Sequence, residues 1–262
     1  MNELSTQNQF SISLSNELES VKVALPPDFN IPRFVQNSVA LLNGNDTLIN
    51  FARQYGTSQI KAGLLRGAYL GLDALNQEMY LIPYGATLQF MIGYRGMIKM
   101  AMKYSQRPIV SIYAKELHEG DKYEESIEDG SIKPKPVMNF ENRDKPIIGV
   151  FAVCKFDDGE VLTEVMTRKE IEKCKAQSKA KNSHAWNQFW GEMAKKTVIR
   201  RLCKPIPIDM DARSKAEFET GTEIETDSYE ISKKEVEEQT ASVPFIVQDD
   251  IPEIPEMEGD FS

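Results

Sequence analysis

The sequence predicts an α+β fold with a largely antiparallel sheet, a hairpin and long packing helices. Apolar residues recur at the helical period in the early and late parts of the chain, whereas short β-prone runs bounded by turn residues lie between them. The resulting order of helices, hairpin, helix, strands and helices is typical of an α+β domain. The chain has 262 residues, 41% of them hydrophobic, which is enough to bury one sizeable core.

The first predicted elements are two helices that follow a polar leader. Residues 1–25 are polar and lack turn residues, so we expect them to be mobile. Asp46 precedes a helix that is expected to end at Gly56, and a second helix, capped by Thr57 or Ser58, is expected to end at Gly71. Glycine is a frequent C-terminal cap, so the two helices should form a helical hairpin.

A β-hairpin and a third helix are predicted next. Residues 79–83 and 87–92 are β-prone, and Gly85 between them can take the positive φ of a tight turn. The helical period resumes over residues 94–106. We expect this helix to pack back onto the hairpin.

The second half of the core is predicted to contain more strands and two closing helices. Strands are expected at 109–117, 147–156 and 160–166, and helices at 168–180 and 185–204. The stretch 119–145 holds Gly130, Pro134 and Pro136, so we expect a long, partly ordered connection there. Pro205 and Pro207 should end the last helix.

Charge is strongly segregated along the chain, whose formal net charge is −9. Residues 211–262 carry sixteen acids and four bases, and this composition predicts a disordered acidic tail. Residues 168–204 carry eleven bases and three acids instead. A positive cluster of this density indicates a polyanionic ligand, although a solvated helix face is the alternative.

The sequence lacks the motifs of several common classes of enzyme. The chain has two histidines and three cysteines without metal-binding spacing, and it lacks the phosphate-loop, dinucleotide-binding, nucleophile-elbow and metalloprotease motifs. We therefore expect no cofactor and no covalent catalysis. The cysteines are expected to be reduced core thiols.

Neither a secretory signal nor a membrane span is predicted. The first ten residues are polar, and basic residues interrupt the longest apolar stretch before it reaches about 18 residues. We expect a cytoplasmic protein without a membrane partner.

One acidic group keeps a nuclease as an alternative. Asp157, Asp158, Glu160 and Glu164 could together bind Mg²⁺. However, the sequence Asp157-Asp158-Gly159 lies where a turn is needed, and no lysine stands two residues beyond Glu164. The acidic group is therefore the weaker hypothesis.

The helix predicted over residues 94–106 carries a basic ridge. Arg95, Lys99 and Lys103 stand at i, i+4 and i+8, and Arg107 follows one step later, so all four share one side of the helix. No acid occurs from residue 93 to residue 115, so the ridge has no local partner to neutralise it. A solvent-facing amphipathic helix is the alternative interpretation.

The last predicted helix combines aromatic and basic residues on one flank. Trp186, Phe189 and Met193 lie beside its apolar stripe, and Lys196 and Arg200 follow on the same flank. This combination of stacking surfaces and phosphate-neutralising bases is typical of proteins that bind single strands. Burial of the tryptophans in the core is the alternative.

Further contacts are expected from a loop and from the β-hairpin. The lysines at 175, 179 and 181 precede the last helix in a small polar segment that could follow a phosphate backbone. Tyr80, Tyr84, Gln89, Phe90 and Tyr94 add polar and aromatic side chains near the ridge, but strand alternation turns about half of them inward. The candidate DNA-binding residues are Arg95, Lys99, Lys103, Arg107, Lys175, Lys179, Lys181, Trp186, Lys195, Lys196, Arg200, Arg201 and Lys204.

Three sequence blocks resemble the hallmark blocks of the RecT family of phage recombinases. They are LGLDALNQEMYLIPYG from residue 70, LQFMIGYRGMIKMA from residue 88 and FWGEMAKKTVIRRLCKPIP from residue 189. The resemblance implies an ATP-independent protein that binds single-stranded DNA, anneals it into duplex, and assembles into rings or helical filaments. It also implies a bacterial host cell, a partner 5′→3′ exonuclease and a host single-strand-binding protein, and a core similar to that of other ring-forming annealing proteins.

On this interpretation residues 26–210 form the DNA-binding and oligomerisation core. The acidic tail has three interpretations: it competes with DNA for the basic surface, docks a partner, or keeps the assembly soluble. A structural oligomer without a nucleic-acid role is a further alternative, and it predicts no binding to DNA at low salt.

Overall fold

A computed structural model of the chain describes residues 3–128, 131–178 and 181–227. The helices are α1 (Glu3–Ser20), α2 (Ile31–Asn43), α3 (Asp46–Tyr55), α4 (Ser58–Leu70), α5 (Tyr94–Tyr104), α6 (Arg168–Gln177), α7 (His184–Gln188), α8 (Trp190–Cys203) and α9 (Ala212–Asp227). The strands are β1 (Met79–Tyr84), β2 (Thr87–Ile92), β3 (Ile109–His118), β4 (Lys122–Glu128), β5 (Ser131–Val137), β6 (Ile147–Phe156) and β7 (Val161–Thr167). The predicted α+β class is confirmed.

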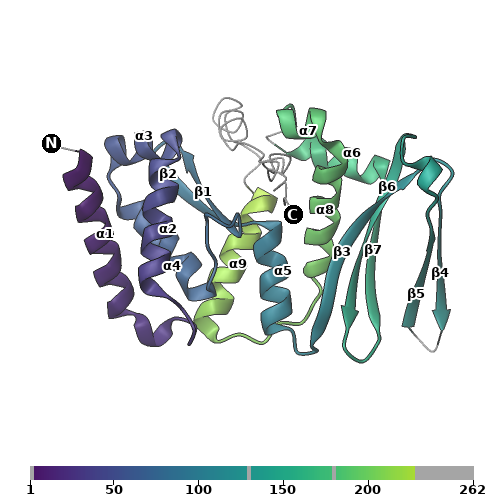
Figure 1. The fold of residues 1–262 in the computed structure, drawn as a ribbon, viewed down its shortest axis with the longest axis horizontal. Helices are drawn as coiled ribbons and strands as arrows, with labels where there is room; N and C mark the ends of the chain where they lie inside the picture. The colour runs from purple at the N-terminus through teal and green to yellow at the C-terminus, as the bar shows by residue number, and fades with distance from the viewer. Residues whose placement is uncertain (1–2, 129–130, 179–180, 228–262) are drawn as a thin grey trace, which may run out of the picture.

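The molecule is elongated, with helices at one end and strands at the other (Figure 1). Helices α1 to α4 form the first end, strands β3 to β7 form the second, and α5, α8 and α9 lie between them. The strands pair antiparallel in three separate sheets, with the orders β1-β2, β3-β6-β7 and β4-β5. The antiparallel pairing was expected, whereas the division into three sheets was not.

Local signals set the C-terminal ends of α3 and α4 as predicted, whereas α3 begins one residue earlier than expected, at Asp46. The Asn45 side chain caps α3 by accepting a hydrogen bond from the Leu48 amide at 3.0 Å. Gly56 and Gly71 end α3 and α4 with φ of 79° and 67°. Gly85 takes φ of 56° in the turn of the β1-β2 hairpin. A side chain at any of these positive φ values would be strained, which explains the glycines.

The inner face of the β1-β2 hairpin packs closely on two helices. A Cβ atom on Gly67 of α4 would stand 2.0 Å from the Met79 sulfur. A Cβ atom on Gly221 of α9 would stand 2.7 Å from the Ile92 side chain. A side chain at either position would force a buried neighbour to move, so the two glycines let the hairpin pack closely against α4 and α9.

Strand β6 is buried on both faces. Val150, Ala152 and Cys154 belong to the main core, whereas Phe151 and Val153 form a second cluster under Tyr123 of the β4-β5 hairpin. Cys154, Cys174 and Cys203 are free thiols, as expected. Burial raises the pKa of Cys154 to about 11 and that of Cys203 to about 12, so both stay protonated at neutral pH.

The expectation of a mobile leader over residues 1–25 is wrong where the structure describes that segment. Residues 3–20 form α1, which packs on α2 and α4. Phe10, Leu14 and Leu18 are buried at i, i+4 and i+8, and Lys61 of α4 bonds to Glu17. Three apolar residues among serines, asparagines and glutamines are a weak pattern, yet they suffice because neighbouring helices cover them.

Shortening a side chain on the buried face of α1 should therefore destabilise the protein. We expect Leu14→Ala to lower the free energy of unfolding by about 3 kcal/mol, because it leaves a cavity around a side chain with no exposed surface. Ile12→Ala on the same helix, where the side chain is 61% exposed, should change it by less than about 0.5 kcal/mol. Urea unfolding of both variants measures the difference. Equal stabilities would show that α1 is not part of the folded core.

Four further regions differ from the sequence prediction. The expected loose connection over 119–145 contains the β4-β5 hairpin, and α2 occupies a region for which no helix was predicted. The predicted helix 185–204 is divided at Phe189, whose φ and ψ of −125° and 47° are not helical. Residues 212–227 of the expected disordered tail form α9, and residues 228–262 lie outside the described part of the chain.

Within the described ranges, no helix has both the length and the apolar character that crossing a bilayer requires.

Candidate nucleic-acid interface

Helices α5 and α8 pack together and bring basic residues from distant parts of the sequence around one tyrosine. The Lys196 ammonium of α8 lies 5.7 Å from the centre of the Tyr94 ring, and the Arg95 guanidinium lies 6.0 Å from it. Arg95 also donates a hydrogen bond from Nε to the Tyr94 hydroxyl at 3.3 Å. Arg200, one helical turn after Lys196, donates to the Ile92 carbonyl at 2.7 Å. We call Tyr94, Arg95, Lys196 and Arg200 the Tyr94 cluster.

Tyr80 of β1 lies close enough to Tyr94, Arg95 and Arg200 to interact with them electrostatically. Burial raises the pKa of the Tyr80 hydroxyl, and the neighbouring Tyr94 raises it further, whereas Arg95 and Arg200 oppose the shift. A Cβ atom on Gly93 would stand 2.8 Å from the Tyr80 ring, so glycine lets the ring lie against the start of α5. The Tyr80 phenol therefore stays neutral and adds no negative charge to the cluster.

The flank of aromatic and basic residues predicted on the last helix is present in α8. Its exposed aromatic residue is Phe189, whereas Trp186 was the one chosen as a DNA-binding residue. Phe189, Met193, Lys196 and Arg200 follow one side of α8, and Lys196 Nζ lies 4.0 Å from the Met193 sulfur. The Phe189 side chain is 41% exposed. This flank adjoins the Tyr94 cluster through Lys196 and Arg200.

Trp186 is not available for stacking on a base, which corrects its selection as a DNA-binding residue. Its side chain is only 4% exposed and belongs to the core, with the Lys175 ammonium 5.8 Å above the ring. Trp190 packs against the same core, and its indole nitrogen donates to Glu172 at 2.8 Å. The alternative interpretation, burial, therefore holds for Trp186 and largely for Trp190.

Three of the four bases on the predicted ridge have acidic partners from distant parts of the chain. Lys99 donates to Glu78 at 2.8 Å and to the Gly71 carbonyl at 2.7 Å. Lys103 lies 3.7 Å from Asp28. The expectation of an unneutralised ridge is wrong for these residues, because the absence of local acids says nothing about acids from other elements.

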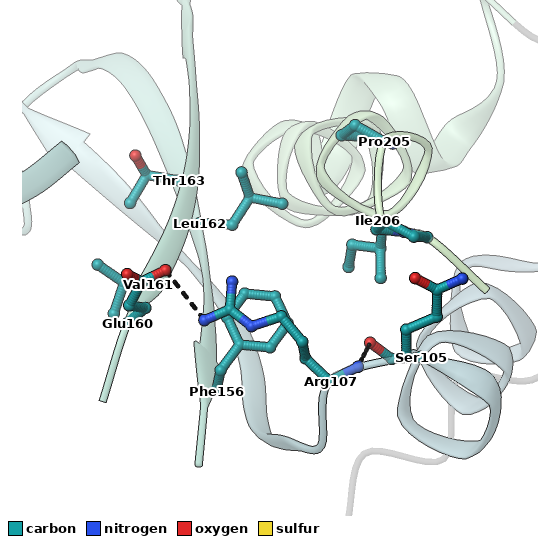
Figure 2. Close-up of a pocket in the computed structure, with 11 residues that line it drawn as sticks. Ser105, Arg107, Phe156, Glu160, Val161, Leu162, Thr163, Pro205 and Ile206 are labelled. Atoms are coloured by element: carbon teal, nitrogen blue, oxygen red, sulfur yellow. Dashed lines mark hydrogen bonds and ion pairs between the residues drawn. The ribbon is translucent and has the colours of Figure 1, made fainter. Parts of the chain in front are cut away.

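Arg107 lies at the far end of α5 from the Tyr94 cluster and lines a cavity of about 350 Å³ (Figure 2). Its guanidinium stacks 4.3 Å from the Phe156 ring and pairs with Asp158 and with Glu160 at 2.9 Å. Leu162 and Ile206 add apolar walls. Because the single positive charge of Arg107 is paired with two carboxylates, the edge of this cavity does not attract phosphate.

The remaining basic candidates lie on other surfaces. Lys195 pairs with Glu192 and lies 3.5 Å from Glu116, and Arg201 lies 2.8 Å from Glu164. Lys181 and Lys204 are exposed. Lys179 lies outside the described residues.

The acidic group considered for a nuclease is divided between two arginines. Arg107 engages Asp158 and Glu160, and Arg201 engages Glu164. In the part of the chain that the structure describes, no three histidine, cysteine or acidic side chains are placed to hold one metal ion. The geometry gives the nuclease hypothesis no support.

Comparison with known proteins shows which family the chain resembles. Residues 32–238 match the model of the RecT family. The chain is 36% identical over 207 residues to Protein RecT of Escherichia coli (strain K12), a match that covers 74% of this chain and 72% of that protein. It is also 29% identical over 167 residues to the uncharacterized protein YqaK of Bacillus subtilis (strain 168), covering 60% of this chain and 55% of that one.

These matches place the molecule among proteins of DNA recombination and strand annealing. More particularly, the chain belongs to the RecT family. The resemblance seen in the three sequence blocks is confirmed, and the matched region contains all of α5 and α8.

Proposed function

We propose that this protein binds single-stranded DNA at the Tyr94 cluster and the adjoining flank of α8, and that it anneals complementary strands as an oligomer without ATP. The observation that carries the proposal is the gathering of Arg95, Lys196 and Arg200 beside the exposed or half-exposed rings of Tyr94 and Phe189. Such a surface offers phosphate neutralisation and stacking together.

The chemistry of annealing fits this surface. Strands must be held by their backbones so that bases stay free to pair, and no bond is made or broken. The residues proposed to act therefore only bind and orient, and the proposal includes no catalytic residue or cofactor. One protomer offers few cations, so a track that continues from copy to copy would provide the affinity. Rings and helical filaments both meet this requirement.

The proposed partners are of two kinds. The basic surface supports single-stranded DNA and the annealed duplex as ligands, since both present a regular line of phosphates. A 5′→3′ exonuclease and a host single-strand-binding protein are proposed from family membership.

An annealing assay without nucleotide tests the proposal. Two complementary oligonucleotides that carry a donor and an acceptor fluorophore are mixed with the full-length protein, with and without ATP. We expect the protein to accelerate duplex formation equally in both cases, and to leave both strands intact on a denaturing gel in Mg²⁺. Shortened strands would support the nuclease, and the absence of a mobility shift at low salt would support a purely structural oligomer. Electron microscopy of the same mixtures shows whether rings or filaments form.

A further inference from the structure

Helix α9 runs antiparallel to α4 and so carries the end of the described chain toward the β1-β2 turn. Near its start, the Arg213 guanidinium stacks 4.0 Å from the Tyr69 ring, close to the end of α4. One turn later Glu217 lies 3.5 Å from Arg66. Continued in this direction, Asp227 lies toward the first residues of α4.

The first residues of α4 lie beside the hairpin turn. The Gln59 side chain donates to the Ala86 carbonyl at 2.9 Å and accepts from the Leu88 amide at 2.9 Å. Figure 1 shows the C-terminal end of α9 between the β1-β2 hairpin and α8. The chain therefore leaves α9 between the β1-β2 hairpin, which leads directly into α5, and α8, which carries Lys196 and Arg200 of the Tyr94 cluster.

The distance to the cluster is short. Gly221 of α9 packs on the Ile92 side chain, and the carbonyl of the same residue accepts the hydrogen bond from Arg200. Asp227 comes six residues after Gly221, about 9 Å further along a helix. A flexible chain of 35 residues has a root-mean-square span of about 33 Å, so residues 228–262 are long enough to reach the cluster.

The charge of this terminal segment is complementary to the cluster. Residues 228–262 contain ten acids and two lysines, and residues 249–260 contain six acids and no base. Ile251, Ile254 and Phe261 are interspersed among or follow those acids. Carboxylates can accept hydrogen bonds from the same guanidinium and ammonium groups that bind phosphate, and apolar side chains can cover the aromatic rings.

We propose that residues 228–262 bind the Tyr94 cluster of their own chain and compete there with DNA. The DNA half of this inference rests on the proposed function. A tethered segment at an effective concentration of about 1 mM, with an intrinsic Kd of about 0.1 mM, would weaken DNA binding roughly ten-fold. DNA bound to several neighbouring copies would still displace it, so the segment would favour long strands over short ones.

Neutralising the tail in the full-length protein tests the competition. The test variant carries Asp249→Asn, Asp250→Asn, Glu253→Gln and Glu256→Gln. The control carries Glu119→Gln, Glu124→Gln, Glu141→Gln and Asp144→Asn, four exposed acids in the β3-to-β6 region that change the net charge equally. Truncation after Pro207 is avoided because it would remove α9, on which the hairpin packs.

We expect the test variant to bind a short labelled oligo-dT about ten-fold more tightly at low salt, with the difference shrinking as salt rises. The control should bind like the unmodified protein. Equal tightening in both variants would show an effect of net charge and would overturn the inference. If the unmodified protein and the test variant bind with one affinity, the tail inference fails alone. If neither binds DNA, the proposed function fails.

Carbodiimide cross-linking provides a second, direct measurement. We expect Lys196 to link to carboxylates of residues 249–260 within one chain, and added oligo-dT to suppress the product. Lys122, exposed on β4, is the control lysine and should give no such link. Links to the tail found solely between chains, or their absence at Lys196, would overturn the inference.

Discussion

Reversing two charges of the Tyr94 cluster, Arg95→Glu with Lys196→Glu, is expected to weaken binding to single-stranded DNA by about 100-fold at low salt. Each change removes an attraction for phosphate and adds a repulsion. A loss of about 1.4 kcal/mol per position is enough for this effect. Arg95 is exposed and Lys196 half-exposed, so the fold should persist. Arg200 is kept because it holds the Ile92 carbonyl.

Fluorescence anisotropy of a labelled oligonucleotide, measured over a range of salt concentrations, tests this prediction. The reversed variant should also show a shallower dependence of log K on log salt, because fewer counterions are released. Lys122→Glu with Lys155→Glu, two exposed lysines on β4 and β6, is the control of equal charge. An equal loss in the control, or an unchanged slope, would contradict a phosphate-binding role for Arg95 and Lys196.

The same variants distinguish DNA contacts from contacts between subunits. Mass photometry should give the reversed variant and the unmodified protein the same size distribution in the absence of DNA. A shift to smaller species would show that Arg95 or Lys196 joins neighbouring copies, and the loss of DNA binding would then follow from the lost assembly.

Local signals allowed much of the helical architecture to be predicted from the sequence. The caps at Gly56 and Gly71 depend on backbone conformation within a few residues, and both are confirmed. Helix α1 was missed because its apolar positions are sparse and its stability depends on burial against α2 and α4. The division of the last helix at Phe189 has no proline or glycine signal at that residue.

The candidate interface was harder to predict because charge pairing is a tertiary property. Lys99 and Glu78 are 21 residues apart, and Arg107 and Asp158 are 51 apart, so a local window cannot show that these bases are neutralised. Periodicity placed Trp186 and Phe189 on one flank of a continuous helix. The break at Phe189 instead lets Trp186 enter the core while Phe189 stays partly exposed. The helix break therefore determines which of the two aromatic residues is exposed, and a periodic pattern cannot show it.

Replacing Gly96 by alanine is expected to lower the free energy of unfolding by about 3 kcal/mol and to weaken DNA binding. A Cβ atom at this position would stand 2.1 Å from the Glu78 carbonyl oxygen and 2.9 Å from the Ile92 side chain. The same carbonyl accepts a hydrogen bond from the Gly93 amide at 2.9 Å, which fixes the start of α5. A backbone oxygen cannot rotate away, so α5 must shift, and such overpacking is costly.

The shift would displace Tyr94 and Arg95 relative to Lys196, because these two residues immediately precede Gly96 while Lys196 stays on α8. Thermal unfolding should show a Tm lower by about 6 to 12 °C for a chain of this size. Gly44→Ala is the control, since Gly44 has an ordinary φ of −89° and a Cβ there would stand 3.3 Å from the Ala40 carbonyl oxygen, which needs a shift of only a few tenths of an ångström. A normal Tm together with normal DNA binding in Gly96→Ala would show that the contact between α5 and the β1-β2 hairpin accommodates the extra methyl group. The predicted destabilisation, and the predicted link between the position of α5 and DNA binding, would then both be wrong.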